Sequence, residues 1–109
     1  MDFGPLVSKK QDRFNELDAI VSEGDIFKNP AQARDILREH NRLKTLLQSW
    51  NTLQKKQSEL AENRELVTGS DPELAELAAA EIPSLEEQVT TLEKEIQISL
   101  LPPDPFLLS

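Results

Sequence analysis

The chain has 109 residues, enough for one domain, and contains no cysteine, which excludes a disulfide framework and a cysteine-based zinc site. Its net charge is −8 and unevenly spread, because residues 1–67 carry eleven basic and eleven acidic side chains whereas residues 68–109 carry nine acidic groups and one lysine. The N-terminus does not resemble a signal peptide and no apolar stretch is long enough to span a bilayer, so we expect a cytoplasmic protein without membrane contact.

The first predicted helix covers about residues 5–22. Pro5 suits the first helical position, where its missing N–H has no partner in any case, and Gly24 ends the helix. Apolar residues recur at helical spacing and form one stripe: Leu6, Phe14, Leu17, Ile20 and Val21. The connector contains Ile26 and Phe27, which we expect to fold back where the first helix meets the second.

The second predicted helix, residues 30–68, is the longest and organises the chain. Asn29 has a side chain suited to capping its start, and Pro30 suits the first helical position. Gly69 follows its end, where we expect the left-handed conformation that commonly terminates helices.

Apolar residues in the second half of this helix follow the alternating steps of a coiled-coil seam. The seam positions are 46, 50, 53, 57, 60, 64 and 67, so that Trp50 lies in the core and Gln57 and Arg64 interrupt the seam with polar groups. The first half has a broader apolar face, which we expect both other helices to cover.

The third predicted helix covers residues 72–101. Its start has two candidate caps, Ser70 with Glu73 at capping-box spacing and Asp71 before Pro72. Pro83 lies inside the helix and predicts either a kink or a restart at that residue. The apolar positions keep one phase throughout: Leu74, Ala78, Ile82, Leu85, Val89, Leu92, Ile96 and Leu100.

Residues 102–109 form a proline-rich exit followed by an apolar tail. The tail either docks back on the helices or marks a truncated chain or a natural fragment. Residues 1–101 are therefore expected to form an all-α domain. We expect an antiparallel three-helix bundle whose long central helix forms a coiled-coil hairpin with the last helix.

The sequence offers little that could support catalysis. His40 is the only histidine, and its place between apolar residues predicts a buried or half-buried structural role. The three glycines are isolated, so no phosphate-binding loop is present. Paired carboxylates on the last helix fit a solvated face. We expect no enzyme activity, cofactor, metal or small-molecule substrate.

Arg34, Arg38 and Arg42 stand at four-residue steps and form one basic ridge on the second helix. One interpretation pairs them with Asp35, Glu39 and the acidic last helix. The other has the ridge contact phosphates or an acidic protein surface. In that interpretation the additional cations are Lys28 and Lys44.

Five stretches in this order resemble the N-terminal helical domain of bacterial class I peptide chain release factors. They are Asn-Pro-Ala-Gln-Ala at 29–33, Leu-Arg-Glu-His-Asn-Arg-Leu-Lys at 37–44, Ser-Asp-Pro-Glu-Leu-Ala-Glu-Leu-Ala at 70–78, Leu-Glu-Lys-Glu-Ile at 92–96 and Leu-Leu-Pro-Pro-Asp-Pro at 100–105. The resemblance spans about residues 6–105, and the last stretch is more similar to the release factor one branch than to release factor two.

The resemblance implies a role in translation termination on the ribosome. In that family the N-terminal domain neither reads the stop codon nor carries the Gly-Gly-Gln loop, and it projects toward the stalk base near the L11 region. The apolar tail departs from the polar linker usual in the family. The alternative is a free-standing coiled-coil adaptor or chaperone-like helical hairpin that dimerises through its seam.

Overall fold

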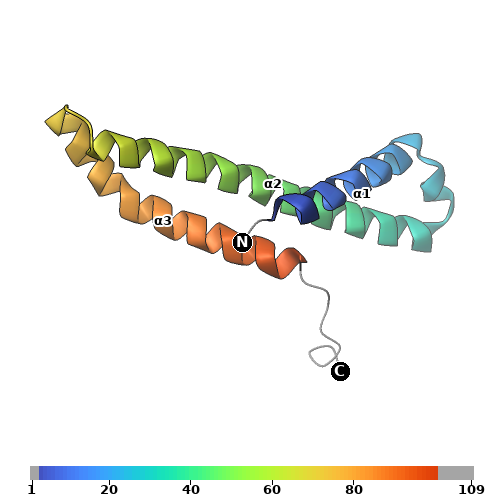
Figure 1. Cartoon of the computed structure of the whole chain (residues 1–109). Helices are drawn as coiled ribbons and strands as arrows, with labels where there is room; N and C mark the ends of the chain where they lie inside the picture. Colours follow the sequence, from blue (N-terminus) through green and yellow to red (C-terminus); the bar gives the residue numbers. More distant parts are fainter. Residues whose placement is uncertain (1–2, 101–109) are drawn as a thin grey trace, which may run out of the picture. The chain divides into compact units, whose positions relative to one another are not determined.

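The computed structural model describes residues 3–100, and this part of the chain is helical without a β-strand. Its elements are α1 (Gly4–Glu23), the short 3-10 helix η1 (Asp25–Lys28), α2 (Pro30–Val67) and α3 (Pro72–Leu100), as Figure 1 shows. The fold divides after Gln48 into two compact units. The prediction of an all-α protein built from helical hairpins is confirmed.

The first unit, residues 3–48, is a hairpin of α1 and the beginning of α2. Gly24 turns the chain between them in the left-handed conformation, with φ of 79°, which glycine adopts without a steric penalty. Ile26 in η1 is buried as predicted, but Phe27 is 56% exposed, so the prediction that both fold inward is wrong for Phe27. In a helix of a single short turn the two neighbours face different directions, and only one of them can face the hairpin.

The start of α2 follows the prediction. The Asn29 side-chain oxygen accepts a hydrogen bond from the Gln32 backbone N–H at 3.3 Å, and its carbonyl accepts from the Ala33 N–H at 2.9 Å. The end of α2 differs from the prediction, because Gly69 does not have a positive φ. Its N–H instead donates to the Leu66 carbonyl at 3.1 Å, which tightens the last turn of the helix.

The second unit, residues 49–100, is a hairpin of the remaining part of α2 with α3. Of the two candidate caps of α3, Asp71 acts: its carboxylate accepts from the N–H groups of Glu73 at 3.0 Å and Leu74 at 3.3 Å. The helix continues through Pro83 without a restart. Pro83 is exposed, where water can bind the carbonyl that the proline leaves unpaired. The predictions for the exit and tail concern residues outside those the structure describes.

Each unit buries its own set of apolar side chains. In the first unit Leu17 is fully buried, whereas Leu6, predicted on the same stripe, is 49% exposed and Val7 is buried instead. The other buried residues of the first unit are Phe3, Ile26, Ala33, Leu43, Leu46 and Leu47. Those of the second unit are Leu53, Leu60, Ala78, Leu85, Val89 and Ile96.

The seam along α2 is buried at the predicted positions Leu46, Leu53 and Leu60 but differs from the prediction at its polar positions. Gln57 and Arg64, the predicted polar interruptions, are exposed. Lys56 and Asn63, each one position earlier, are half-buried instead, and the Asn63 amide donates to the Glu59 carbonyl at 2.8 Å. An α-helix repeats every 3.6 residues rather than every 3.5, so the face that meets a partner drifts from a strict heptad. Trp50, predicted in the core, is half-buried.

Replacement of a buried seam leucine measures how closely the second unit packs. Leu53 is 1% exposed, so Leu53→Ala should lower the free energy of unfolding by about 2–5 kcal/mol through lost burial and a new cavity. Leu77 is 66% exposed, and Leu77→Ala serves as the matched control with an effect within about 0.5 kcal/mol. Urea denaturation followed by circular dichroism compares them. Equal losses of unfolding free energy in the two variants would contradict the burial of Leu53 in the core of the second unit.

Candidate functional site

The basic ridge lies on the first part of α2. Arg34, Arg38 and Arg42 are all exposed, and their four-residue spacing places them on one side of the helix. Within the first unit none of the three forms an ion pair. The expected pairing with Asp35 and Glu39 is therefore not formed, and the three guanidinium groups remain available to a partner.

The two additional cations differ in their surroundings. Lys28 Nζ lies 3.7 Å from Asp25 Oδ1, and both side chains are more than four-fifths exposed, so this contact is weak. Lys44 is exposed and forms no ion pair within the first unit. Lys44 therefore adds an unpaired positive charge to the same part of α2.

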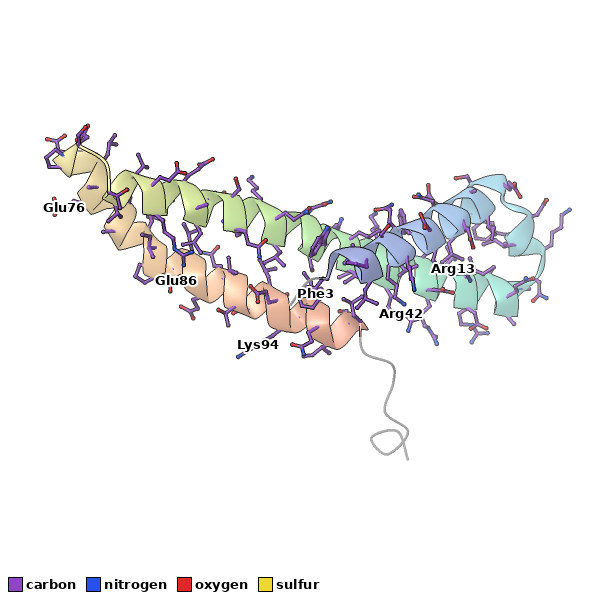
Figure 2. All side chains as sticks on the ribbon, viewed as in Figure 1. Phe3, Arg13, Arg42, Glu76, Glu86 and Lys94 are labelled. Carbon is purple, nitrogen blue, oxygen red and sulfur yellow. The ribbon has the colours of Figure 1, made fainter. Side chains whose placement is uncertain are left out.

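Arg13 of α1, which sequence reasoning did not single out, binds Glu39 of α2 through two hydrogen bonds. Its Nε donates to Glu39 Oε1 at 2.8 Å and its Nη2 donates to Oε2 at 3.2 Å, while Nη1 donates to Glu16 Oε2 at 3.1 Å. The planar guanidinium matches a carboxylate in this paired geometry. Figure 2 labels Arg13 on α1 and Arg42 on α2. The contact joins residues 26 positions apart, so no local sequence signal reveals it.

These contacts shift the ionisation of both partners. Hydrogen bonds from Arg13 lower the pKa of Glu39, partial burial of the carboxylate opposes this, and the charges of Arg13, Arg42 and Lys10 lower it further. The hydrogen bonds to Glu39 and then Glu16 raise the pKa of Arg13. The pair is therefore charged on both sides at neutral pH.

His40 has the structural role that its position predicts. Its imidazole stacks on Phe14 of α1, with ring centroids 4.7 Å apart and an interplanar angle of 24°. Nε2 lies 3.0 Å from Asp18 Oδ1, within hydrogen-bond distance. The side chain is 18% exposed. Both contacts run from α2 to α1, so His40 joins the two helices of the hairpin.

The hairpin tip of the second unit has the opposite character. Four large apolar side chains flank the turn between α2 and α3 and are exposed: Leu66, Val67, Leu74 and Leu77. The chain from residue 65 to residue 81 contains five acidic residues and no basic one. Figure 2 labels one of them, Glu76, near the turn. The tip thus offers apolar contact area within a negatively charged border.

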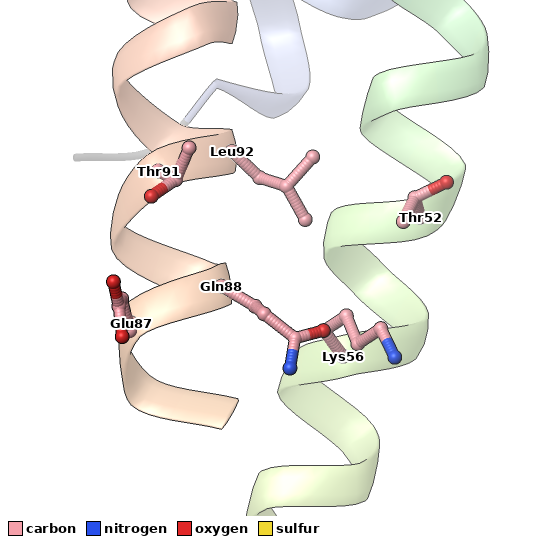
Figure 3. Close-up of a pocket in the computed structure, with 6 residues that line it drawn as sticks. All are labelled: Thr52, Lys56, Glu87, Gln88, Thr91 and Leu92. Carbon is pink, nitrogen blue, oxygen red and sulfur yellow. The ribbon is translucent and has the colours of Figure 1, made fainter. Parts of the chain in front are cut away.

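A groove of about 350 Å³ lies between the two helices of the second unit and is shown in Figure 3. Its lining residues are Thr52, Lys56, Glu87, Gln88, Thr91 and Leu92. Gln88 and Leu92 extend from α3 toward α2, whereas Lys56 also lies 3.7 Å from its neighbour Glu59.

In residues 3–100 no group of His, Asp and Glu side chains is arranged to hold a metal ion. No helix in the same range combines the length and apolar character of a membrane span.

Comparison with known proteins gives a consistent result. The model of the PCRF domain matches residues 10–106. The chain is 46% identical over 104 residues to "Peptide chain release factor 1" of Akkermansia muciniphila, which covers 95% of the chain and 29% of that protein. It is 38% identical over 99 residues to the protein of that name from Geotalea uraniireducens, which covers 91% of the chain and 27% of that protein.

A third relative of the same name, from Geobacter sulfurreducens, is 40% identical over 93 residues, which is 85% of the chain and 26% of that protein. The chain therefore spans less than a third of the length of these curated relatives. No solved structure matches the chain.

The lowered pKa of Glu39 makes the stability of the hairpin depend on pH. Above the unfolded-state pKa of about 4.3 the ion pair contributes fully, and its contribution is lost as the pH falls through the lower folded-state pKa. The difference in free energy of unfolding between the wild type and Glu39→Gln should therefore be constant from pH 7 to about pH 5 and shrink below about 4.3. Urea denaturation at each pH measures it.

Glu23→Gln is the control for this experiment, because Glu23 is exposed on α1 and forms no ion pair within the first unit. The difference in free energy of unfolding between the wild type and Glu23→Gln should not show the decrease below about pH 4.3 that is expected for Glu39→Gln. If the difference in free energy of unfolding between the wild type and Glu39→Gln stays unchanged down to pH 3, the lowered pKa of Glu39 in the Arg13–Glu39 pair is contradicted.

Proposed function

We propose that this chain, which belongs to the PCRF domain family, is the ribosome-docking N-terminal domain of a stop-codon-dependent peptide chain release factor. The observation that carries the proposal is the family match over residues 10–106, together with relatives that are all named peptide chain release factor 1. The domain would comprise residues 1–101, with residues 102–109 as its exit toward a following segment.

The role assigned to this domain is positional. It orients the factor in the ribosomal A site through surface contacts, while stop-codon reading and ester hydrolysis belong to other domains of the factor. Such a role requires exposed surfaces of defined charge rather than a reactive cleft. The basic ridge on α2 and the hairpin tip are surfaces of this kind.

The two surfaces suit different parts of a ribosome. The guanidinium groups of Arg34, Arg38 and Arg42 are exposed and unpaired within the first unit, as binding to the phosphates of ribosomal RNA requires. Lys28 and Lys44 would add to this contact. The hairpin tip cannot attract phosphate, because it is acidic, and its exposed leucines suit a protein surface with basic residues. We assign it to the stalk base, near the L11 region.

The isolated chain should bind bacterial 70S ribosomes that carry a stop codon in the A site, and it should compete with an intact release factor. Combined replacement of Arg34, Arg38 and Arg42 by Gln should weaken this binding by about tenfold at low salt, as expected for three exposed charge contacts. The dependence of log K on log salt concentration should also become shallower by about one per lost phosphate contact. Cosedimentation at several salt concentrations measures both quantities.

A charge-matched control removes the same number of positive charges from the second unit, by replacing Lys55, Arg64 and Lys94 with Gln. This variant should keep most of the wild-type affinity if the ridge makes the contact. Equal losses in both triple variants would indicate a nonspecific effect of net charge. Absence of competition with the intact factor would contradict the proposed function itself.

A further inference from the structure

We propose that Arg13 is a positioning residue for the ridge: by binding Glu39 it prevents this carboxylate from pairing with Arg42, and so keeps Arg42 available for phosphate. The inference rests on the proposed function, because it concerns the same ridge. It makes the availability of the ridge, whose arginines all lie on α2, depend on a residue of α1.

Glu39 lies beside the ridge and would compete with phosphate for its arginines. It precedes Arg42 by three residues, a spacing at which oppositely charged side chains on a helix can pair. The two charges already interact, since Arg42 contributes to lowering the pKa of Glu39. Arg42 nevertheless forms no ion pair within the first unit. The contact that replaces this pairing is the one with Arg13.

The geometry shows why Arg13 prevails over Arg42. Arg13 engages both carboxylate oxygens of Glu39, at 2.8 and 3.2 Å, in the paired arrangement that is stronger than a single contact. Its third nitrogen is fixed by Glu16 at 3.1 Å, which leaves the guanidinium already oriented. Nearby, the stack of Phe14 on His40 holds α1 against the same stretch of α2. Glu39 is therefore kept on the α1 side of the helix.

The same bonds argue against a direct role for Arg13 in phosphate binding. All three of its side-chain nitrogens donate to carboxylates, which leaves only two of the five guanidinium N–H groups for any other acceptor. The net charge of Arg13 with its two partners is negative. Arg13 would therefore act on the partner through Glu39 and Arg42 rather than by contact.

The test is a double-mutant cycle measured as affinity for the stop-programmed 70S ribosome. Arg13→Gln should weaken binding about two- to fivefold, the size of one exposed charge contact, because Glu39 then turns to Arg42. Glu39→Gln should change binding little in the wild type, where Arg13 already holds the carboxylate. Arg13→Gln combined with Glu39→Gln should restore affinity to that of Glu39→Gln alone. The coupling between the two positions is the predicted signature.

Asp35→Asn is the matched control, because Asp35 also lies beside the ridge, three residues before Arg38, but forms no ion pair with Arg13. Its effect on affinity should be the same with and without Arg13→Gln. If only the total charge of the chain mattered, the effects of Arg13→Gln and Glu39→Gln on affinity would add, as would those of Arg13→Gln and Asp35→Asn. Additive effects of Arg13→Gln and Glu39→Gln would overturn the inference. So would unchanged affinity in Arg13→Gln.

The decisive comparison is between Glu39→Gln and the double variant, so it does not depend on the folding of the single Arg13→Gln variant. Once Glu39 is neutral, Arg13 has no carboxylate of the ridge to hold, so Glu39→Gln and the double variant should bind equally and show the same helical signal by circular dichroism. Weaker binding by the double variant would mean that Arg13 itself contacts the ribosome or supports the fold, and would overturn the inference. If replacing the three ridge arginines has no effect, the proposed function of the ridge fails instead.

Discussion

The pairing of α1 with the first part of α2 depends on buried apolar side chains, and Leu17, which is fully buried, is the clearest example. Burial of one such side chain contributes about 1.5–3 kcal/mol, whereas exposed ion pairs contribute little. Polar and aromatic contacts also join defined positions of the two helices: Arg13 with Glu39, Asp18 with His40 and Phe14 with His40. Residues on the opposite side of α2 from these contacts face away from α1.

The placement of charge gives each unit a distinct surface. The first unit presents three arginines of α2 that form no ion pair within it, and the carboxylate that could neutralise Arg42 is bound by Arg13 of α1. The second unit carries the acidic excess of the chain, and its tip combines negative charge with exposed leucines. Within residues 3–100 no buried side-chain nitrogen or oxygen lacks a hydrogen-bond partner, so the cores need nothing from outside to satisfy them. The chemistry open to partners therefore lies on the surface, as the proposed docking role requires.

Local chemistry made several features predictable from the sequence. Asn29 caps α2 because its side chain reaches a backbone N–H three residues later, and the all-α class follows from helical apolar spacing. Features that depend on how two helices meet were not predictable. Lys56 rather than Gln57 is half-buried because the contact face follows the true helical period, and Gly69 closes a tightened turn rather than a left-handed one. The Arg13–Glu39 pair depends on the register of the hairpin, which no pattern within a single helix encodes.

The central claim is that the ridge on α2 lies against ribosomal RNA. Because the chain contains no cysteine, a single Asn41→Cys replacement beside Arg42 gives a unique attachment point for an iron–EDTA probe that generates hydroxyl radicals. On stop-programmed 70S ribosomes this probe should cleave ribosomal RNA at a few discrete positions. The cleavage should disappear when Arg34, Arg38 and Arg42 are replaced by Gln in the same labelled chain. Absence of discrete cleavage, or identical cleavage with and without the three arginines, would contradict the account.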